Sequence, residues 1–329
     1  MIMKRAARLI FSIFMLFMFA LGSMPVNARI ISDDVKIPSE VEQEEDNGVL
    51  NLQSYNCNTN DTTYFTHSVD LTEFEGILTT PTYFSEEIRA SLAENENSRD
   101  GSWQTANVQN LPYSAVMYLS IWIDANDDGI PQLSEYAQGT GYLVGPNVLL
   151  TAAHNTYQIG TGVVDQVRAY LQYENGGSST PYYAGTFIWS TAYTQYGNEN
   201  YDWCIMIMQD DLGGEVGWYY GLGTYGDYNP VGDDITISGY SSSVFGAYQH
   251  YCDGEITDKT TYKIKYDIDT KSGQSGSPVY NAYQTNWIAW GIHTKSASLF
   301  TDASGVRFTY TLYDIICDKI DEGKELYGY

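Results

Sequence analysis

The chain has 329 residues, and 41 acidic side chains against 16 basic ones give it a net charge of −25 at pH 7. Nucleic acids and anionic membrane surfaces attract basic proteins, so this composition argues against both as partners. It favours solubility, and we expect a monomer. Acidic peptides are not excluded as ligands, because specificity depends on a local pocket rather than on the net field.

The N-terminus has the three parts of a secretory signal peptide. Lys4, Arg5 and Arg8 form a basic start, residues 9–21 are an apolar stretch, and residues 26–28 provide a small-residue cleavage site. The apolar stretch is too short for a stable membrane anchor. We therefore assign residues 1–28 to a signal peptide and expect a secreted, extracellular protein.

Residues 29–97 differ in composition from the C-terminal two thirds of the chain. They are rich in Glu, Asp, Asn, Ser and Thr, their apolar clusters are short, and the acidic run at 42–46 is not expected to pack. A propeptide fits this composition, and a disordered acidic leader without an inhibitory role is the alternative. We expect the folded domain to span residues 98–329. The residue before its amino terminus stays open among Arg89, Glu94, Glu96 and Arg99.

The remaining sequence predicts many short strands. β-Branched and aromatic runs alternate with clusters of Gly, Asn, Asp and Ser, which is typical of an all-β barrel or sandwich. We predict strands at residues 116–123, 141–150, 167–173, 203–208, 234–238, 262–266, 278–280 and 287–293. A C-terminal helix over 312–322 is predicted by the helical spacing of Leu312, Ile315, Ile316 and Ile320. We expect a subdomain boundary near residues 213–233.

Residues 124–135 match the pattern of an EF-hand calcium loop. Glycine occupies loop position six, and the ligands would be Asp124, Asn126, Asp128, the backbone of Ile130, and Glu135. However, the flanking segments are predicted strands rather than helices, and Pro131 replaces the usual apolar residue. A structural calcium ion and an acidic hairpin loop without metal therefore both stay open.

Three motifs carry candidate chemistry in the order histidine, aspartate, serine. His154 ends the apolar run at 149–153, Asp202 begins the run at 203–207, and Ser275 lies in the small-residue turn 273–276. Such a turn presents the serine hydroxyl and leaves the amides of Gly273 and Ser275 free to form an oxyanion hole. This chain order belongs to one lineage of triads, in which the histidine is the base, the aspartate orients it and the serine is the nucleophile. The alternative is structural: a turn serine, a packed histidine and a strand-capping aspartate.

The other cysteines and histidines indicate less. Cys204 is expected to be buried, a Cys252–Cys317 disulfide stays open, and the odd number of cysteines after Cys57 leaves one thiol over. No spacing resembles a zinc site. We interpret His67, and His250 in a loop-like stretch, as incidental.

These motifs resemble the glutamyl endopeptidase branch of the chymotrypsin-like bacterial serine proteases. The resemblance extends from about Arg99 to the C-terminus and includes residues 139–145, 239–240, 272–279, 291–293 and 305–309. It implies two six-stranded antiparallel β-barrels with a C-terminal helix, and it carries over the triad of His154, Asp202 and Ser275. It also implies a pocket for an acidic side chain formed by Thr270 and His293.

On this resemblance we expect a serine endopeptidase that cleaves peptides and proteins after glutamate, and less well after aspartate, with no cofactor for catalysis. Gln274 stands where trypsin-type enzymes have an aspartate, so a buried salt bridge to the new amino terminus is not expected. In the resembled branch that terminus instead helps to bind the substrate carboxylate. The alternatives are the same fold with another specificity, if His293 is turned away, and a non-catalytic secreted binding module or toxin-like protein.

Overall fold

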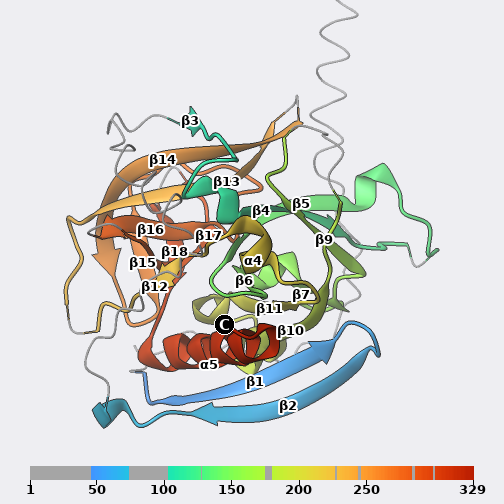
Figure 1. Ribbon diagram of the computed structural model, residues 1–329, viewed down its shortest axis with the longest axis horizontal. Coiled ribbons are helices and arrows are strands. Elements are labelled where there is room, and N and C mark those ends of the chain that lie inside the picture. The colour runs from blue at the N-terminus through green and yellow to red at the C-terminus, as the bar shows by residue number, and fades with distance from the viewer. Residues whose placement is uncertain are drawn as a thin grey trace, which may run out of the picture. The chain divides into compact units, whose positions relative to one another are not determined.

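The computed structural model describes residues 46–73, 103–126, 128–174, 180–226, 228–243, 246–283, 286–298 and 301–329. Within these ranges the chain forms two large β-sheets and a C-terminal helix, α5 (Tyr310–Tyr327) (Figure 1). The predicted signal peptide and the candidate processing positions at 89–99 lie outside the described residues. None of the described helices is long and apolar enough to cross a membrane.

The first sheet is a six-stranded barrel with a hairpin added to it. Its strand order is β2-β1-β10-β11-β6-β5-β4-β9, and a bridge between Ala169 and Tyr182 connects β9 to the segment before β10. That bridge closes the six strands from β10 to β9 into a barrel. The strands are β4 (Val116–Trp122), β5 (Tyr136–Leu143), β6 (Val148–Thr151), β9 (Gln166–Leu171), β10 (Ala184–Ser190) and β11 (Cys204–Met208).

The second sheet closes in the same way. Its order is β12-β17-β16-β13-β14-β15-β18, and the antiparallel pairing of β17 with β18 completes a ring of six strands. The ring consists of β13 (Asp234–Ser243), β14 (Gly246–Lys259), β15 (Lys263–Tyr266), β16 (Pro278–Tyr283), β17 (Asn286–Lys295) and β18 (Ala303–Arg307). The expected pair of six-stranded barrels is therefore confirmed.

Short elements complete the two barrels. β3 (Gln104–Thr105) pairs with β14, and β12 (Gly221–Leu222) runs parallel to β17. β7 (Tyr157–Gln158) and β8 (Gly162–Val163) form a separate two-stranded sheet. The helices α3 (Thr191–Tyr196) and α4 (Leu212–Val216) follow β10 and β11.

Most predicted strands are confirmed, with two corrections. The single strand predicted at 141–150 is two strands, because β5 ends at Leu143 and β6 begins at Val148. Pro146 lies between them, and proline offers no amide hydrogen for continuing a ladder. His250 lies inside β14 rather than in a loop. The strands β10, β14 and β18 had no predicted counterpart over most of their length.

The predicted C-terminal helix is confirmed and extends further than the predicted range. The Thr309 hydroxyl caps α5 by accepting a hydrogen bond from the amide of Leu312 at 3.2 Å. The four residues with helical spacing are buried in the same apolar cluster as the first barrel. At Gly145, an added Cβ would lie 3.0 Å from the Ile320 side chain, so the helix packs tightly on the β5–β6 turn.

A hairpin from the acidic N-terminal region extends the first sheet. β1 (Val49–Asn56) pairs with β2 (Asp61–Ser68) on one side and with β10 on the other. Leu50 and Leu52 alternate into the core and are 6% and 0% exposed. The alternative of a disordered leader is wrong for residues 46–73, whereas residues 42–45 of the acidic run lie outside the described residues.

Candidate active site

The first barrel brings His154 and Asp202 together. His154 lies in the 3-10 turn Ala153–Asn155 directly after β6, and Asp202 ends the 3-10 turn Glu199–Tyr201 before β11. Because β6 and β11 pair with Thr151 opposite Cys204, the two turns lie at the same end of the barrel. The ring Nδ1 of His154 lies 2.8 Å from one carboxylate oxygen of Asp202, and the His154 amide donates to the other at 3.0 Å.

The electrostatics of this pair suit a base held by a carboxylate. Burial by itself lowers the pKa of His154, but the charge and hydrogen bond of Asp202 outweigh burial, so the net pKa is raised. Burial raises the pKa of Asp202, but His154 outweighs that effect and the net pKa is lowered. The Asp202 side chain is 10% exposed, whereas the His154 side chain is 35% exposed. The ring is thus fixed on one side and accessible on the other.

The Ser275 turn packs directly against the first barrel. Gly276 has φ +92°, and a Cβ there would lie 1.9 Å from the Thr140 carbonyl oxygen, so only glycine fits. The carbonyl of Ser275 accepts hydrogen bonds from the Thr140 amide and the Asn155 side chain, both at 2.9 Å. Because Asn155 follows His154, this contact ties the serine to the histidine turn.

No hydrogen bond connects the His154 ring to the Ser275 hydroxyl within the described part of the chain. Such bonds are often long without substrate and tighten in the complex. The structure therefore brings His154 and Asp202 into direct contact and places the Ser275 turn beside them.

In the Ser275 turn, amides that donate a hydrogen bond to the protein alternate with amides that do not. Gln274 donates its amide to the Lys271 carbonyl at 3.1 Å, and Gly276 donates to the His293 carbonyl at 2.7 Å. The amides of Gly273 and Ser275 donate no hydrogen bond to any described residue. These are the two amides that the sequence indicates as oxyanion donors.

His293 and Thr270 each carry a buried polar atom without a partner among the described residues. His293 is 0% exposed, and its Nδ1 lies 2.5 Å from the hydroxyl of Tyr266, while its Nε2 has no partner. Thr270 is 4% exposed, and its Oγ1 has no partner. Burial, followed by the charges of His154 and Lys263, lowers the pKa of His293 to about 3, so the free ring is neutral. Buried polar atoms are rarely left unpaired unless something else satisfies them.

A pocket of about 290 Å³ beside the triad adds residues that sequence reasoning missed. Its lining includes His154, Asp202, Lys263, Thr294 and Lys295. Lys263 donates to the Thr294 hydroxyl at 3.2 Å, and Lys295 pairs with Glu199 at 3.2 Å. Burial lowers the pKa of Lys263 to about 8, although Asp202 and Glu199 favour its charged form. Lys263 alternates with apolar residues along β15. Surface lysines commonly show the same alternation, so the sequence did not mark Lys263 as a site residue.

The predicted calcium loop is a connection between β4 and β5. Its first carboxylate, Asp124, accepts hydrogen bonds from the amides of Asp128 at 3.2 Å and Gly129 at 2.7 Å. Glu135 instead accepts from the Trp122 ring at 3.2 Å and the Gln132 amide at 3.1 Å. Within the described ranges, the carboxylates of this loop do not gather within 4.8 Å of one another. Both donors bind the same oxygen of Glu135, which leaves its other oxygen for an ion, and calcium binding stays a prediction.

None of the four cysteines, all of which lie within the described residues, forms a disulfide bond. Cys204 is buried, as expected. Cys252 lies in the core of the second barrel and Cys317 packs against the core of the first, so the structure contains no bridge between them.

Comparisons with known proteins show the family and the fold of this chain. The Trypsin family model matches residues 102–306. A protein of Bacillus subtilis named extracellular metalloprotease is 33% identical over 223 residues, which are 66% of this chain and 67% of that protein. The glutamyl endopeptidase of Bacillus licheniformis is 29% identical over 227 residues, 65% of this chain and 66% of that protein. The chain thus matches about two thirds of the length of these relatives.

Solved structures show the same fold. A Glu endopeptidase structure has a TM-score of 0.55 at 24% identity and covers 68% of this chain and 98% of its own. The protease Anisep from Arthrobacter nicotinovorans has a TM-score of 0.54 at 14% identity and covers 67% of this chain and 100% of its own.

Proposed function

Because the chain belongs to the trypsin family of serine endopeptidases, we propose that it is a secreted enzyme that cleaves proteins after glutamate, and less well after aspartate. Secretion is supported by the signal-peptide pattern and by the extracellular name of the Bacillus subtilis relative. The preference for glutamate is supported by the name of the Bacillus licheniformis relative. The acidic N-terminal region is proposed to be cut from the protease domain during maturation.

The geometry supports the following catalytic roles in our proposal. Ser275 attacks the scissile carbonyl, and the exposed side of the His154 ring takes its proton. Asp202 contacts both the ring and the backbone of His154, so it fixes the tautomer and stabilises the imidazolium that forms. The unused amides of Gly273 and Ser275 are the donors for the tetrahedral oxyanion. His154 then returns the proton to the leaving amine, and water hydrolyses the acyl-enzyme by the same route.

The observation that carries the specificity is the unpaired Nε2 of the buried His293. In our proposal the Tyr266 hydroxyl donates to Nδ1, which leaves the ring proton on Nε2 as a donor. Thr270 supplies a second donor from its hydroxyl. A substrate carboxylate taken out of water needs such donors, since burying it unpaired is prohibitive. The His293 ring is neutral in the free enzyme, so it binds the substrate carboxylate through hydrogen bonds rather than through a positive charge.

The experiment is cleavage of a peptide library by the processed protein, with sequencing of the product ends. We expect new ends after glutamate and, less often, after aspartate, and we expect a serine-directed organophosphonate to abolish cleavage. A chelator serves as the control, because one relative carries the name metalloprotease. Cleavage that stops with chelator and persists with the phosphonate would contradict the serine mechanism. Cleavage that shows no preference for acidic residues would contradict the pocket alone.

A further inference from the structure

The hairpin of β1 and β2 lies outside the part of the chain that the family explains. The family model begins at residue 102, whereas the hairpin ends at Ser68. Nevertheless β1 is a regular member of the first sheet. Its residues 52–56 pair in antiparallel register with residues 190–186 of β10. Without the hairpin, β10 would expose this edge, and free sheet edges readily pair with another strand.

Side chains anchor the hairpin as well as the backbone. Leu50 and Leu52 belong to the apolar cluster of the first barrel, and Gln53 is also buried. The Thr191 hydroxyl at the start of α3 donates to the carbonyl of Asn51 at 3.2 Å. Removing the hairpin would therefore open an apolar surface on the barrel, which soluble proteins usually cover.

A second set of contacts connects the hairpin to α5. The carboxylate of Asp46 accepts hydrogen bonds from the amide of Thr311, at 3.0 Å, and from the Thr311 hydroxyl. Thr311 lies in the first turn of α5, where a negative charge is favourable. The hairpin segment thus satisfies donors at the start of the helix that closes the molecule.

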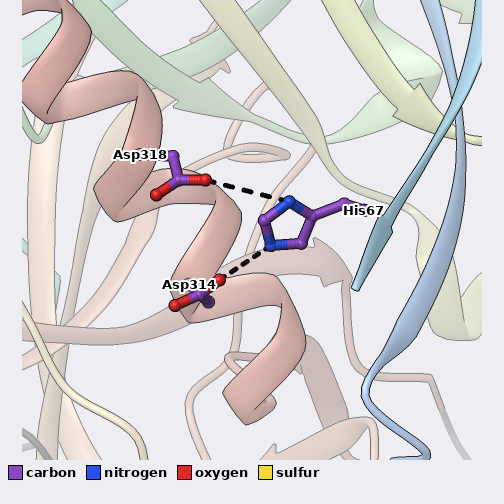
Figure 2. Close-up of side chains that lie close together, drawn as sticks. All are labelled: His67, Asp314 and Asp318. Atoms are coloured by element: carbon purple, nitrogen blue, oxygen red, sulfur yellow. Dashed lines mark hydrogen bonds and ion pairs between the residues drawn. The ribbon is translucent and has the colours of Figure 1, made fainter. Parts of the chain in front are cut away.

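The third contact is an ion-pair cluster around His67 (Figure 2). Nε2 of His67 lies 2.8 Å from Asp314, and Nδ1 lies 3.8 Å from Asp318. Asp314 and Asp318 are one turn apart on α5, so they share a face. Each ring nitrogen faces a different carboxylate, which is the arrangement of an ion pair shared by two acids. His67 thus connects the hairpin to α5, a structural contact that the sequence did not predict.

The hairpin does not line the pocket beside the triad. All residues that line that pocket lie between His154 and Lys295. The hairpin instead lines a separate pocket with Tyr55, Cys57, Asn58 and Asn60. Retaining the hairpin is thus compatible with an accessible triad.

We propose that residues 46–73 remain bound to the protease after maturation, as a non-covalent partner that completes the edge of the first barrel and holds α5. This inference rests on the proposed cleavage between the hairpin and the protease domain. The partner is a segment of the same chain, and binding is by strand addition. The apolar residues of β1 and the contacts of Asp46 and His67 set its stability.

The test uses the full chain with Ser275→Ala, so that its result does not depend on activity. A recognition sequence for a foreign protease is inserted between Asn95 and Glu96, the chain is cut there, and the products are separated by size and weighed. We expect both fragments to elute together at micromolar concentration and to separate only in denaturant. A hairpin fragment that leaves a protease fragment with an unchanged melting curve would overturn the proposal.

Variants sharpen this test. Leu52→Asp places a charge in the core and should raise the released fraction by at least about tenfold, and His67→Ala should raise it less. Thr62→Ala, on the exposed strand β2, is the matched control and should leave retention unchanged. Equal release from all three variants would overturn the assigned contacts. Release by a chelator alone would overturn the ion-pair assignment, because it would identify His67, Asp314 and Asp318 as metal ligands.

If the wild-type chain is never cut before residue 103, the proposed maturation fails. Retention in the cut Ser275→Ala chain is still decided by the same measurement. Activity on glutamyl peptides is measured separately, so a failure of the proposed function is distinguishable from release of the hairpin.

Discussion

The two barrels differ in whether the hydrogen-bonding groups that they contribute to the site already have partners. In the first barrel, both carboxylate oxygens of Asp202 already bind His154, so the base is assembled before substrate arrives. In the second barrel, Nε2 of His293, Oγ1 of Thr270 and the amides of Gly273 and Ser275 have no partner within the described ranges. Leaving a buried polar group unpaired costs roughly 1–3 kcal/mol. In the proposed function, these unpaired donors of the second barrel bind the substrate.

The largest expected effect comes from removing the proposed nucleophile, Ser275, which the second barrel contributes. Ser275→Ala keeps the turn, because alanine needs no more room, and it should lower kcat by about 10⁶-fold. The measurement is hydrolysis of a glutamyl peptide, with circular dichroism to show that the fold is intact. Ser272→Ala, in the exposed part of the same segment, is the control and should stay active. Near-normal activity of Ser275→Ala would rule out the mechanism.

The next test changes the preassembled pair. Asp202→Asn should lower kcat by about 10⁴-fold, as loss of the orienting carboxylate does in triads of this kind. The Asp202 charge helps to raise the pKa of His154, and the base must be neutral to act. Removing that charge lowers the pKa, so the acid limb of the pH profile of the residual activity should move to lower pH.

Lys263→Met provides the opposite shift as a control. The Lys263 cation lowers the pKa of His154, so its removal should move the acid limb to higher pH with little loss of activity. This difference from wild type should disappear in buffer alkaline enough that His154 is neutral in both proteins, because the acid limb reports only the titration of the base. Shifts of the same sign in both variants would contradict the assignment of charges around the base.

The role of the unpaired donors of the second barrel is tested by substituting His293. Leucine has no donor, and losing one hydrogen bond to a charged group costs roughly 1.5–3 kcal/mol, about a tenfold to hundredfold drop in kcat/KM. The loss should fall on glutamyl peptides and much less on matched glutaminyl peptides. His293→Gln, which keeps a donor, should retain part of the preference. A ratio of the two efficiencies that is unmoved by His293→Leu would show that the pocket lies elsewhere.

How much of this could be predicted from sequence depended on how local each feature is. His154, Asp202 and Ser275 each lie in a short recognisable motif, and the buried stripe of α5 repeats within a few residues. The closing pairs of the barrels and the strands β10 and β14 did not stand out. β10 pairs with β1, which lies far away in the chain. β14 pairs with its chain neighbours β13 and β15, but its sequence is rich in polar residues.

The hairpin could not be predicted for the same reason. Leu50 and Leu52 belong to a short apolar cluster in an acidic region, and only the pairing of β1 with β10 makes them core residues. The partner of His67 lies 247 residues away, so no local pattern marks it. Likewise, Lys263 is recognisable as part of the site only once β15 lies beside the Asp202 turn.

The smallest expected effect is a calcium-dependent rise in Tm that depends on the loop at 124–135 of the first barrel. Measuring it tests whether the first barrel is fully assembled without a ligand. If calcium binds only the native state, a concentration of 100 Kd stabilises it by about 2.7 kcal/mol, which corresponds to a rise of several degrees in Tm. Trp122 and Gln132 already occupy one oxygen of Glu135, which leaves only the other for the ion, so we expect a rise of only a few degrees. Thermal melts with excess calcium and with chelator measure it, and Glu135→Gln, which loses the charge that would hold the ion, should reduce the rise. Identical melting curves in calcium and in chelator would show that the loop is an acidic hairpin connection without metal. The first barrel would then be fully assembled without a ligand, as the contact of Asp202 with His154 is.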